Sequence, residues 1–270
     1  MAVTRITQLP DRADLVRFEP GQGQRFIVTV DTEEEFDWGK PIARSGHTVQ
    51  TVARLARFQE FCEGLGVCPI YLVDYPIISS APAVEILRDA VAAGRAEVGV
   101  QLHPWVNPPF EEEVSEFNSF VGNLPAELEQ RKFRELRDAI EKRIGVAPLI
   151  YRAGRYGVGP NTLPILREGG IRIDTSVRSR FDYSSTGGPN FRDFPLSPWW
   201  LDREAGLLEL PLTTVYWGPL RQLGPWLYPK MWRVPRLRGA LARIGMLERI
   251  PLTPEGVTLE EAQRGIDIAL

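Results

Sequence analysis

Two carboxylates that follow an apolar segment are the first residues in this sequence that could do chemistry. In RFIVTVDTEEEF, Asp31 and Glu33 come directly after residues 25–30, which are expected to form a buried strand. Alternate residues of an extended chain point to the same side, so both side chains should share one face. Two neighbouring carboxylates repel each other unless a proton or a cation lies between them. A divalent metal would relieve this repulsion, with one carboxylate as ligand and the other as a base, whereas Glu34 and Glu35 are expected to be solvated.

Further polar residues stand at the ends of other predicted strands. His103, in QLHPWVNPP, is a candidate ligand or acid–base group, although a lone histidine is commonly only packed or capping. Arg152 and Arg155, in YRAGRYG, could orient a carboxylate through paired hydrogen bonds or serve only in structural ion pairs. Asp174, in IRIDTSV, could pair with either arginine. His47 is expected near a helix start at the surface, with a supporting role left open.

Apolar runs alternate with helical patterns along the chain, and this alternation must position the candidate residues. Strands are predicted at 25–30, 67–74, 96–103, 147–154, 171–177 and 206–213, and helices at 48–66, 81–94, 125–144 and 161–170. Strands separated by helical crossovers pair in parallel. The candidate residues then gather at the carboxyl ends of the strands, where α/β barrels assemble their active sites. No glycine-rich nucleotide-binding signature follows any of these strands.

Composition excludes several classes of protein and function. The chain has 270 residues, a formal net charge of −3 and a pI near 5.6, which argues against a nucleic-acid partner. Cys62 and Cys68 are too far apart for a redox pair and are expected to be reduced core thiols. No segment is apolar enough for a signal peptide or a membrane span, so a cytoplasmic location is expected. A single domain is predicted at 25–270, after an N-terminal extension at 1–24.

Five motifs together resemble a known family. VTVDTEEEF, EVGVQLHPW, YRAGRYG, GIRIDTSV and LLELPLT are similar, in this order, to the successive motifs of polysaccharide deacetylases of the NodB-homology type, and look closest to the WalW-like branch. The resemblance covers about residues 25–256. It implies an α/β fold, a distorted parallel (β/α) barrel that here lacks its last strand. It also implies metal-dependent removal of an N-acyl group from an amino-sugar of a surface polysaccharide or its precursor, with zinc as the expected metal.

The resemblance also implies roles for individual residues. Asp31 is expected to be the catalytic base, with Arg152 and Arg155 beside it, and Glu33 and His103 are expected to hold the metal. The residues expected to contact the carbohydrate are Trp38, Trp105, Asn107, Tyr156, Glu209 and Pro211.

Three departures from the family pattern leave other functions open. The second motif has one histidine where two are usual, and Gln101 stands nearby. Thr32 separates an acidic pair that is usually adjacent, and no histidine follows His103. One alternative is therefore a catalytically impaired module that binds a glycan or a partner. Another is a barrel glycoside hydrolase that uses Glu33 and Glu209 as its carboxylate pair.

An aromatic and basic excursion occupies about residues 214–250. Between Pro219 and Arg249 the sequence has seven basic residues and one acidic residue, Glu248. Aromatic faces bind sugar rings, and arginines bind acidic sugars or phosphates. Three roles are compatible with this composition: a segment that simply packs over the barrel, a substrate lid or groove, or peripheral contact with a membrane surface.

Overall fold

A seven-stranded sheet forms the centre of the protein. The computed structural model describes residues 5–19, 21, 25–253 and 256–270. The strands, in spatial order, are β1 (Thr29–Thr32), β2 (Ile70–Val73), β3 (Glu97–Leu102), β4 (Ile150–Ala153), β5 (Ile173–Asp174), β7 (Leu207–Glu209) and β6 (Trp199–Asp202). All neighbours pair in parallel except β6 and β7. This confirms the predicted α/β class with a mainly parallel sheet. Within the described residues β1 and β6 are the two edge strands of this sheet, and closure into a barrel stays a prediction.

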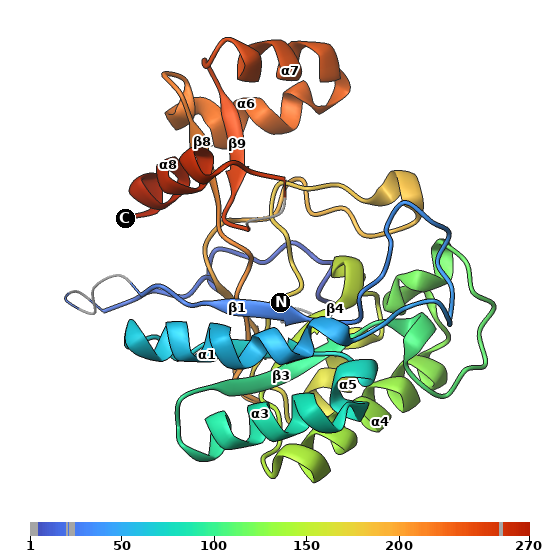
Figure 1. The fold of residues 1–270 in the computed structure, drawn as a ribbon. Coiled ribbons are helices and arrows are strands. Elements are labelled where there is room, and N and C mark those ends of the chain that lie inside the picture. The colour runs from blue at the N-terminus through green and yellow to red at the C-terminus, as the bar shows by residue number, and fades with distance from the viewer. Residues whose placement is uncertain (1–4, 20, 22–24, 254–255) are drawn as a thin grey trace.

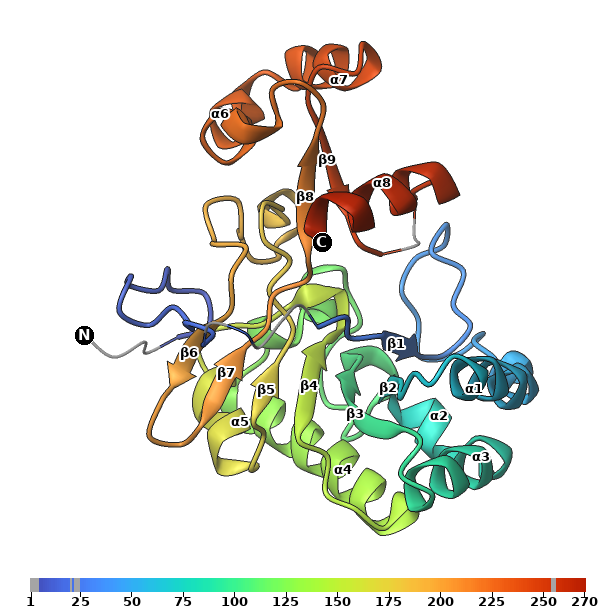
Figure 2. The same cartoon turned by 90° about the vertical axis from the view of Figure 1, so that its left-hand side faces the viewer.

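Helices connect the parallel strands and lie along one side of the curved sheet (Figure 2). They are α1 (Arg54–Gly64), α2 (Tyr75–Ser79), α3 (Ala81–Ala92), α4 (Ala126–Ile144) and α5 (Thr162–Glu168). The apolar stripe predicted for 125–144 is buried in α4, from Leu128 through Leu136 to Ile144. This helix ends at Gly145, whose φ of 95° is the left-handed conformation that glycine adopts without strain.

Two predictions about local burial were wrong. The first strand begins at Thr29 rather than at residue 25, and the side chains of Phe26 and Ile27 are exposed. Both cysteines are free, as expected, but only Cys62 is buried, whereas Cys68 is exposed. In both places the sequence is apolar, but no neighbouring element covers it.

The C-terminal part forms a separate two-stranded sheet beyond the main one (Figure 1). β8 (Thr214–Trp217) and β9 (Glu248–Pro251) pair antiparallel, with α6 (Gly224–Lys230) and α7 (Pro235–Arg243) between them in the chain. α8 (Leu259–Ala269) packs on β8. The predicted domain bounds, 1–24 and 25–270, stay predictions. Within the described residues, no helix combines the length and apolar character that crossing a bilayer requires.

Candidate functional site

The register of the parallel sheet brings the candidate residues to one rim. Gln101 on β3 lies opposite Arg152 on β4, and Asp174 on β5 lies opposite Glu209 on β7. Asp31 is the third residue of β1, so it projects from the same end of the sheet. Parallel pairing therefore places side chains from five motifs, far apart in sequence, at the carboxyl ends of neighbouring strands.

Asp31 is held by a buried arginine. Nη1 of Arg152 donates to Oδ1 of Asp31, and Nη2 donates to Oγ1 of Thr29 at 3.0 Å. Nε of Arg152 donates to the carbonyl oxygen of Thr175 at 3.3 Å. The Arg152 side chain is 3% exposed, whereas that of Asp31 is 32% exposed. The guanidinium thus fixes one carboxylate oxygen from below, while the Asp31 side chain remains accessible from solvent.

The imidazole of His103 lies between two carboxylates. Its Nε2 is 3.3 Å from Oε2 of Glu33, and its Nδ1 is 2.8 Å from Oε2 of Glu34. The ring stacks on Trp105 with centroids 4.5 Å apart. Burial lowers the pKa of His103, but the charges of Glu34 and Glu33 outweigh it and raise this pKa to about 10. Without a cation the two carboxylates therefore favour a doubly protonated ring, and a metal bound at Nε2 would displace the proton there.

Glu34 is buried, so the expectation that it is solvated was wrong. Its Oε1 accepts a hydrogen bond from Nε1 of Trp105 at 2.8 Å, and its backbone N–H donates to Asp74 at 2.7 Å. Burial would raise its pKa, but the charge and hydrogen bond of His103 lower it to about 2. The alternation that places Asp31 and Glu33 on one face also places Thr32 and Glu34 on the other. That signal was present in the sequence, and it identifies Glu34 as an inward-facing residue.

Glu35, also expected to be solvated, lies at the surface but has local partners. Its carboxylate accepts hydrogen bonds from Oγ1 of Thr48 and, at 2.5 Å, from the backbone N–H of Thr51. These bonds close the loop between β1 and the first helical turn. The half-buried His47 precedes Thr48 in this loop, and its Nδ1 has no hydrogen-bond partner.

Three buried side chains lie close enough together to be considered as metal ligands. Glu34, Asp74 and His103 bring potential ligand atoms within 4.8 Å of one another. Each oxygen of Asp74 already accepts a backbone N–H, from Ile77 at 2.9 Å and from Glu34 at 2.7 Å, and burial raises the pKa of Asp74 well above its usual range, so it is a poor anionic ligand. Glu34 instead fits the outer carboxylate that orients a metal-binding histidine through Nδ1.

The other ring nitrogen of His103 faces a better set of ligands. Glu33 lies against Nε2, and Nε2 of Gln101 donates to the same Glu33 oxygen at 2.7 Å. Oε1 of Gln101 is buried without a partner, an orphaned acceptor beside these two groups. A carboxylate, an imidazole nitrogen and a free amide oxygen are a donor set that fits a divalent cation.

A second pair of acids lies below Arg152. Asp174 and Glu209 are fully buried, and each accepts from the chain that follows β5: Asp174 from the N–H of Ser176 at 3.2 Å and Glu209 from that of Val177 at 3.0 Å. Burial raises the pKa of Asp174 to about 6. Burial and the neighbouring Asp174 raise the pKa of Glu209 well above its usual range. This pair therefore holds a proton to higher pH than two isolated carboxyl groups would.

Several other candidate residues are not gathered around Asp31. Asp174 bonds to Ser176 and not to an arginine, which corrects the expected pairing. Arg155 contacts Glu116 at 3.3 Å and lies over the ring of Phe120. Its φ of 55° is the left-handed conformation, which turns the chain sharply after β4.

The residues expected to contact substrate differ in accessibility. Trp38 is 54% exposed and meets Trp105 edge-on at 6.1 Å. Tyr156 is half-buried and stacks on Tyr183 at 5.8 Å. The others, Trp105, Asn107, Glu209 and Pro211, are buried. Their described positions make them supports of the rim, whereas Trp38 and Tyr156 reach its surface.

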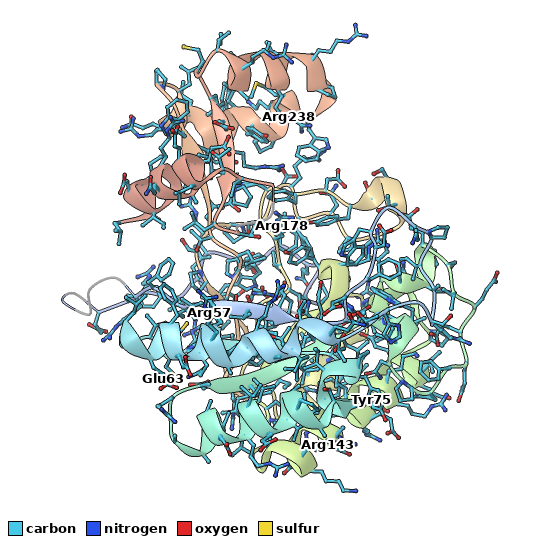
Figure 3. All side chains as sticks on the ribbon, in the orientation of Figure 1. Arg57, Glu63, Tyr75, Arg143, Arg178 and Arg238 are labelled. Carbon is cyan, nitrogen blue, oxygen red and sulfur yellow. The ribbon has the colours of Figure 1, made fainter. Side chains whose placement is uncertain are left out.

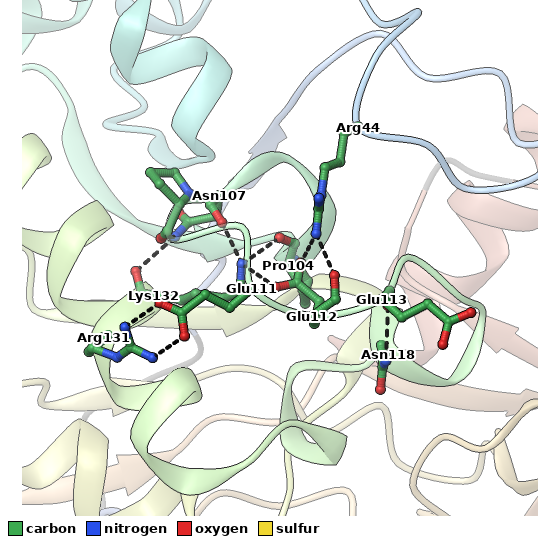
Figure 4. A network of polar contacts seen from close by, with 10 residues as sticks. Arg44, Pro104, Asn107, Glu111, Glu112, Glu113, Asn118, Arg131 and Lys132 are labelled. Atoms are coloured by element: carbon green, nitrogen blue, oxygen red, sulfur yellow. Dashed lines mark hydrogen bonds and ion pairs between the residues drawn. The ribbon is translucent and has the colours of Figure 1, made fainter.

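A buried lysine that the sequence reading missed fixes the loop after β3 (Figure 4). Nζ of Lys132 donates to the carbonyl oxygens of Pro104 and Asn107, at 2.9 and 2.6 Å, and pairs with Glu112 at 3.0 Å. Arg44 donates to the carbonyl oxygen of Glu112 and so ties the loop after β1 to the same network. Lys132 interrupts the apolar stripe of α4, and that position was the available signal.

The chain closing β4 also limits the space around His103. Gly154 follows the strand directly, and a Cβ at this position would overlap the imidazole ring and the carbonyl oxygen of Leu102. Only glycine therefore permits this close approach.

No family model matches this chain. No curated protein matches it either. Among solved structures, the chain is similar to one from Mycobacterium smegmatis assigned as a polysaccharide deacetylase, with 20% identity, a TM-score of 0.41 and coverage of 60% of this chain. It is also similar to a family 4 acetyl xylan esterase from Clostridium thermocellum in complex with a cobalt ion, with 14% identity, a TM-score of 0.35 and coverage of 58%.

A third similar structure is a 4-alpha-glucanotransferase from Thermococcus litoralis, with 16% identity, a TM-score of 0.43 and coverage of 79% of this chain. The aligned parts span 45%, 60% and 31% of these three chains, in the order given. TM-scores this low do not by themselves establish a shared fold.

Proposed function

We propose that this protein is a metal-dependent hydrolase that removes an N-acyl group, such as acetyl, from an amino-sugar. The observation that carries the proposal is the arrangement of side chains at one rim of the sheet. There the buried Arg152 fixes Asp31, and Glu33, two residues further along, lies against the imidazole of His103. The five-motif resemblance to polysaccharide deacetylases supports the same chemistry. The WalW-like branch, a surface polysaccharide or its precursor as substrate, zinc as the metal and a cytoplasmic location belong to this proposal and rest on the sequence.

Each residue has a defined task in the proposed reaction. Glu33 and His103 would hold the cation, with the amide oxygen of Gln101 as a further donor. A bound cation would polarise the acyl carbonyl as a Lewis acid. Asp31 removes a proton from the attacking water, whose oxygen bonds to the acyl carbon. The carbon–nitrogen bond then breaks, and the proton on Asp31 passes to the leaving nitrogen.

The surrounding residues keep this arrangement in place. Arg152 orients Asp31, and Glu34 orients His103 through Nδ1. Trp38, on the exposed side, offers an aromatic face to a sugar ring. The burial of Glu209 argues against the glycoside hydrolase alternative, because a fully buried carboxyl group does not reach a glycosidic bond.

One observation favours a second candidate, a glycan-binding module with impaired catalysis. The amide nitrogen of Gln101 donates to the Glu33 oxygen that would bind the cation, so a donor competes with the metal for this ligand. In this case the protein would bind amino-sugar oligomers and release no acid from them.

Acetate release from N-acetylglucosamine oligomers, measured with added zinc, cobalt or manganese, tests the proposal. The native chain should release acetate only with metal, and Asp31→Asn should abolish release while metal binding persists. Asp37→Asn, in the exposed part of the same segment, is the matched control and should stay active. Glycan binding without acetate release would support the second candidate. Equal release by Asp31→Asn and the native chain would overturn the assignment of the base.

A further inference from the structure

The end of the molecule formed by α6 and α7 exposes large apolar side chains. Both helices lie at the far end of the C-terminal unit, away from the seven-stranded sheet (Figures 1 and 2). The exposed side chains are Leu223, Trp226, Val234, Leu237 and Ile244, between 47% and 69% exposed. We call this set, with the basic residues described below, the α6–α7 surface. Large apolar side chains grouped in this way commonly mark an interaction site.

The sequence periodicity places these side chains on defined helix faces. Leu237 and Leu241 are four residues apart in α7 and share one face, while Val234 and Ile244 flank the two ends of this helix. Leu241 packs against the small apolar cluster around Tyr228. The helix is thus anchored through Leu241, and exposed apolar side chains flank it at both ends.

The same segment is strongly basic. From Pro219 to Leu247 the sequence has no acidic residue, although the whole chain has a net charge of −3. Among the side chains of this segment that the structure describes, the exposed basic ones are Arg221, Lys230, Arg236 and Arg243. None of these four forms an ion pair within the described part of the chain. Lys230 lies over the Trp226 ring, with Nζ 3.4 Å from the centroid, so a cation and an indole share one exposed position.

Other arginines anchor the unit. Arg249 on β9 donates to the carbonyl oxygen of Arg180 and lies over the ring of Phe181. Arg238 lies over the Trp232 ring, with its guanidinium carbon 4.5 Å from the centroid. Figure 3 shows Arg238 in the α6–α7 end and Arg178 nearer the main sheet. Arg238 and Arg249 therefore stabilise the C-terminal unit itself, whereas the four exposed basic side chains are accessible to a partner.

The residue types favour a lipid surface over a protein partner. Between Pro219 and Leu247 the sequence has few neutral side chains that can form hydrogen bonds. They are Gln222, the buried Tyr228 and the indoles of Trp226 and Trp232. A protein interface depletes charge at its core and needs directional hydrogen bonds. Exposed Trp and Leu flanked by Lys and Arg instead suit the headgroup region of a bilayer, where apolar side chains insert and cations meet anionic lipid.

We propose that the α6–α7 surface binds peripherally to a bilayer that contains anionic phospholipid. This binding uses none of the rim residues, so it is independent of the proposed hydrolysis. It would place the protein where amino-sugars attached to lipid are located.

Co-sedimentation of the full chain with vesicles tests this proposal. Binding is expected with vesicles of phosphatidylcholine and phosphatidylglycerol, much less with phosphatidylcholine alone, and it should weaken as salt increases. Arg236→Glu and Arg243→Glu should each weaken binding by about fivefold or more. Trp226→Ser and Ile244→Ser should weaken it as well, since the apolar contribution is lost.

Matched controls come from elsewhere on the surface. Arg57→Glu, on the exposed side of α1, and Phe61→Ser, with an exposed ring, should bind like the native chain. All variants should keep the native circular dichroism spectrum. The proposal would be overturned by equal binding to charged and uncharged vesicles, or by native binding in the α6–α7 variants. A change of molecular mass in Ile244→Ser without any vesicle binding by the native chain would point to self-association and also overturn it.

Discussion

Arg152 reaches Asp31 across 121 residues of sequence, and its buried guanidinium holds a carboxylate that remains partly exposed. Thr29 on β1 and the carbonyl oxygen of Thr175, just after β5, fix the same guanidinium. The orientation of the proposed base therefore depends on the planar shape of arginine and on its charge.

Replacing this arginine by lysine should lower turnover more than substrate binding. A single ammonium group cannot serve Asp31, Thr29 and Thr175 together, so Arg152→Lys should reduce kcat by about 100-fold with a smaller change in KM. Arg155→Lys is the control, because Arg155 contacts Glu116 and Ser119 instead. A loss in Arg155→Lys that equals the loss in Arg152→Lys would contradict the roles given to the two arginines.

The buried acid behind His103 should control metal affinity. In Glu34→Gln, Nδ1 of His103 loses its charged acceptor, so zinc affinity measured by calorimetry should fall by about 10- to 100-fold. Glu35→Gln changes the adjacent position, where the carboxylate binds Thr48 and Thr51, and should leave affinity unchanged. Equal affinities for the native chain and Glu34→Gln would show that Glu34 does not support the metal ligand.

A histidine at position 101 should strengthen the site. Gln101 now donates to Glu33, and in Gln101→His an imidazole nitrogen would replace the amide as a ligand. Zinc affinity should rise by about tenfold or more, and acetate release at limiting metal should rise with it. Gln130→His, at a distant position on α4, controls for adventitious binding by a new histidine. Unchanged affinity in Gln101→His would place the metal elsewhere.

Glu129 should make stability depend on pH in the neutral range. It is buried between α4 and α5, accepts from Oγ1 of Thr162 at 2.5 Å, and burial raises its pKa from 4.5 to about 7. The folded state thus binds more protons than the unfolded state between these values, so stability falls as pH rises through them. Glu129→Gln should remove about 3 kcal/mol of this pH dependence, as measured by urea unfolding at pH 5 and pH 8. Identical pH dependence in both proteins would contradict the shifted pKa.

Removing the buried lysine of α4 should loosen the loop after β3. Lys132→Met removes the nearer of the two cations beside the buried Glu112 carboxylate and leaves Arg44 at 3.8 Å, at a cost of up to about 3–5 kcal/mol in unfolding free energy. Adding Glu112→Gln should recover part of this loss because the buried charge that lost its nearer partner disappears. Lys142→Met, at an exposed site of the same helix, should change stability by less than about 0.5 kcal/mol.

Regular periodicity made part of the fold predictable. The stripe of α4 and its final glycine gave the helix within one residue of its observed bounds, and the strand ends located the rim. Periodicity failed where exposure depends on distant segments. Phe26 and Ile27 look like core residues, yet nothing covers them, and β6 pairs antiparallel through contacts that no local pattern specifies.

The place of the candidate site in the sheet was predictable from the sequence, but the burial of its residues was not. Asp31, Glu33, His103 and Arg152 do meet at one rim. The burial of Glu34 depends on Asp74 and Trp105, which lie 40 and 71 residues further along the chain. Such partners become visible only when the strands are placed in register.

The close approach of Gly154 to His103 has a practical meaning for protein engineering. Every substitution at 154 inserts atoms where the imidazole edge already lies, so this position has no tolerance for even one methyl group. Libraries that aim to change metal choice or substrate range should keep Gly154 constant. Their diversity belongs at Gln101, which bonds to Glu33, and at Trp38, which meets the His103 ring edge-on.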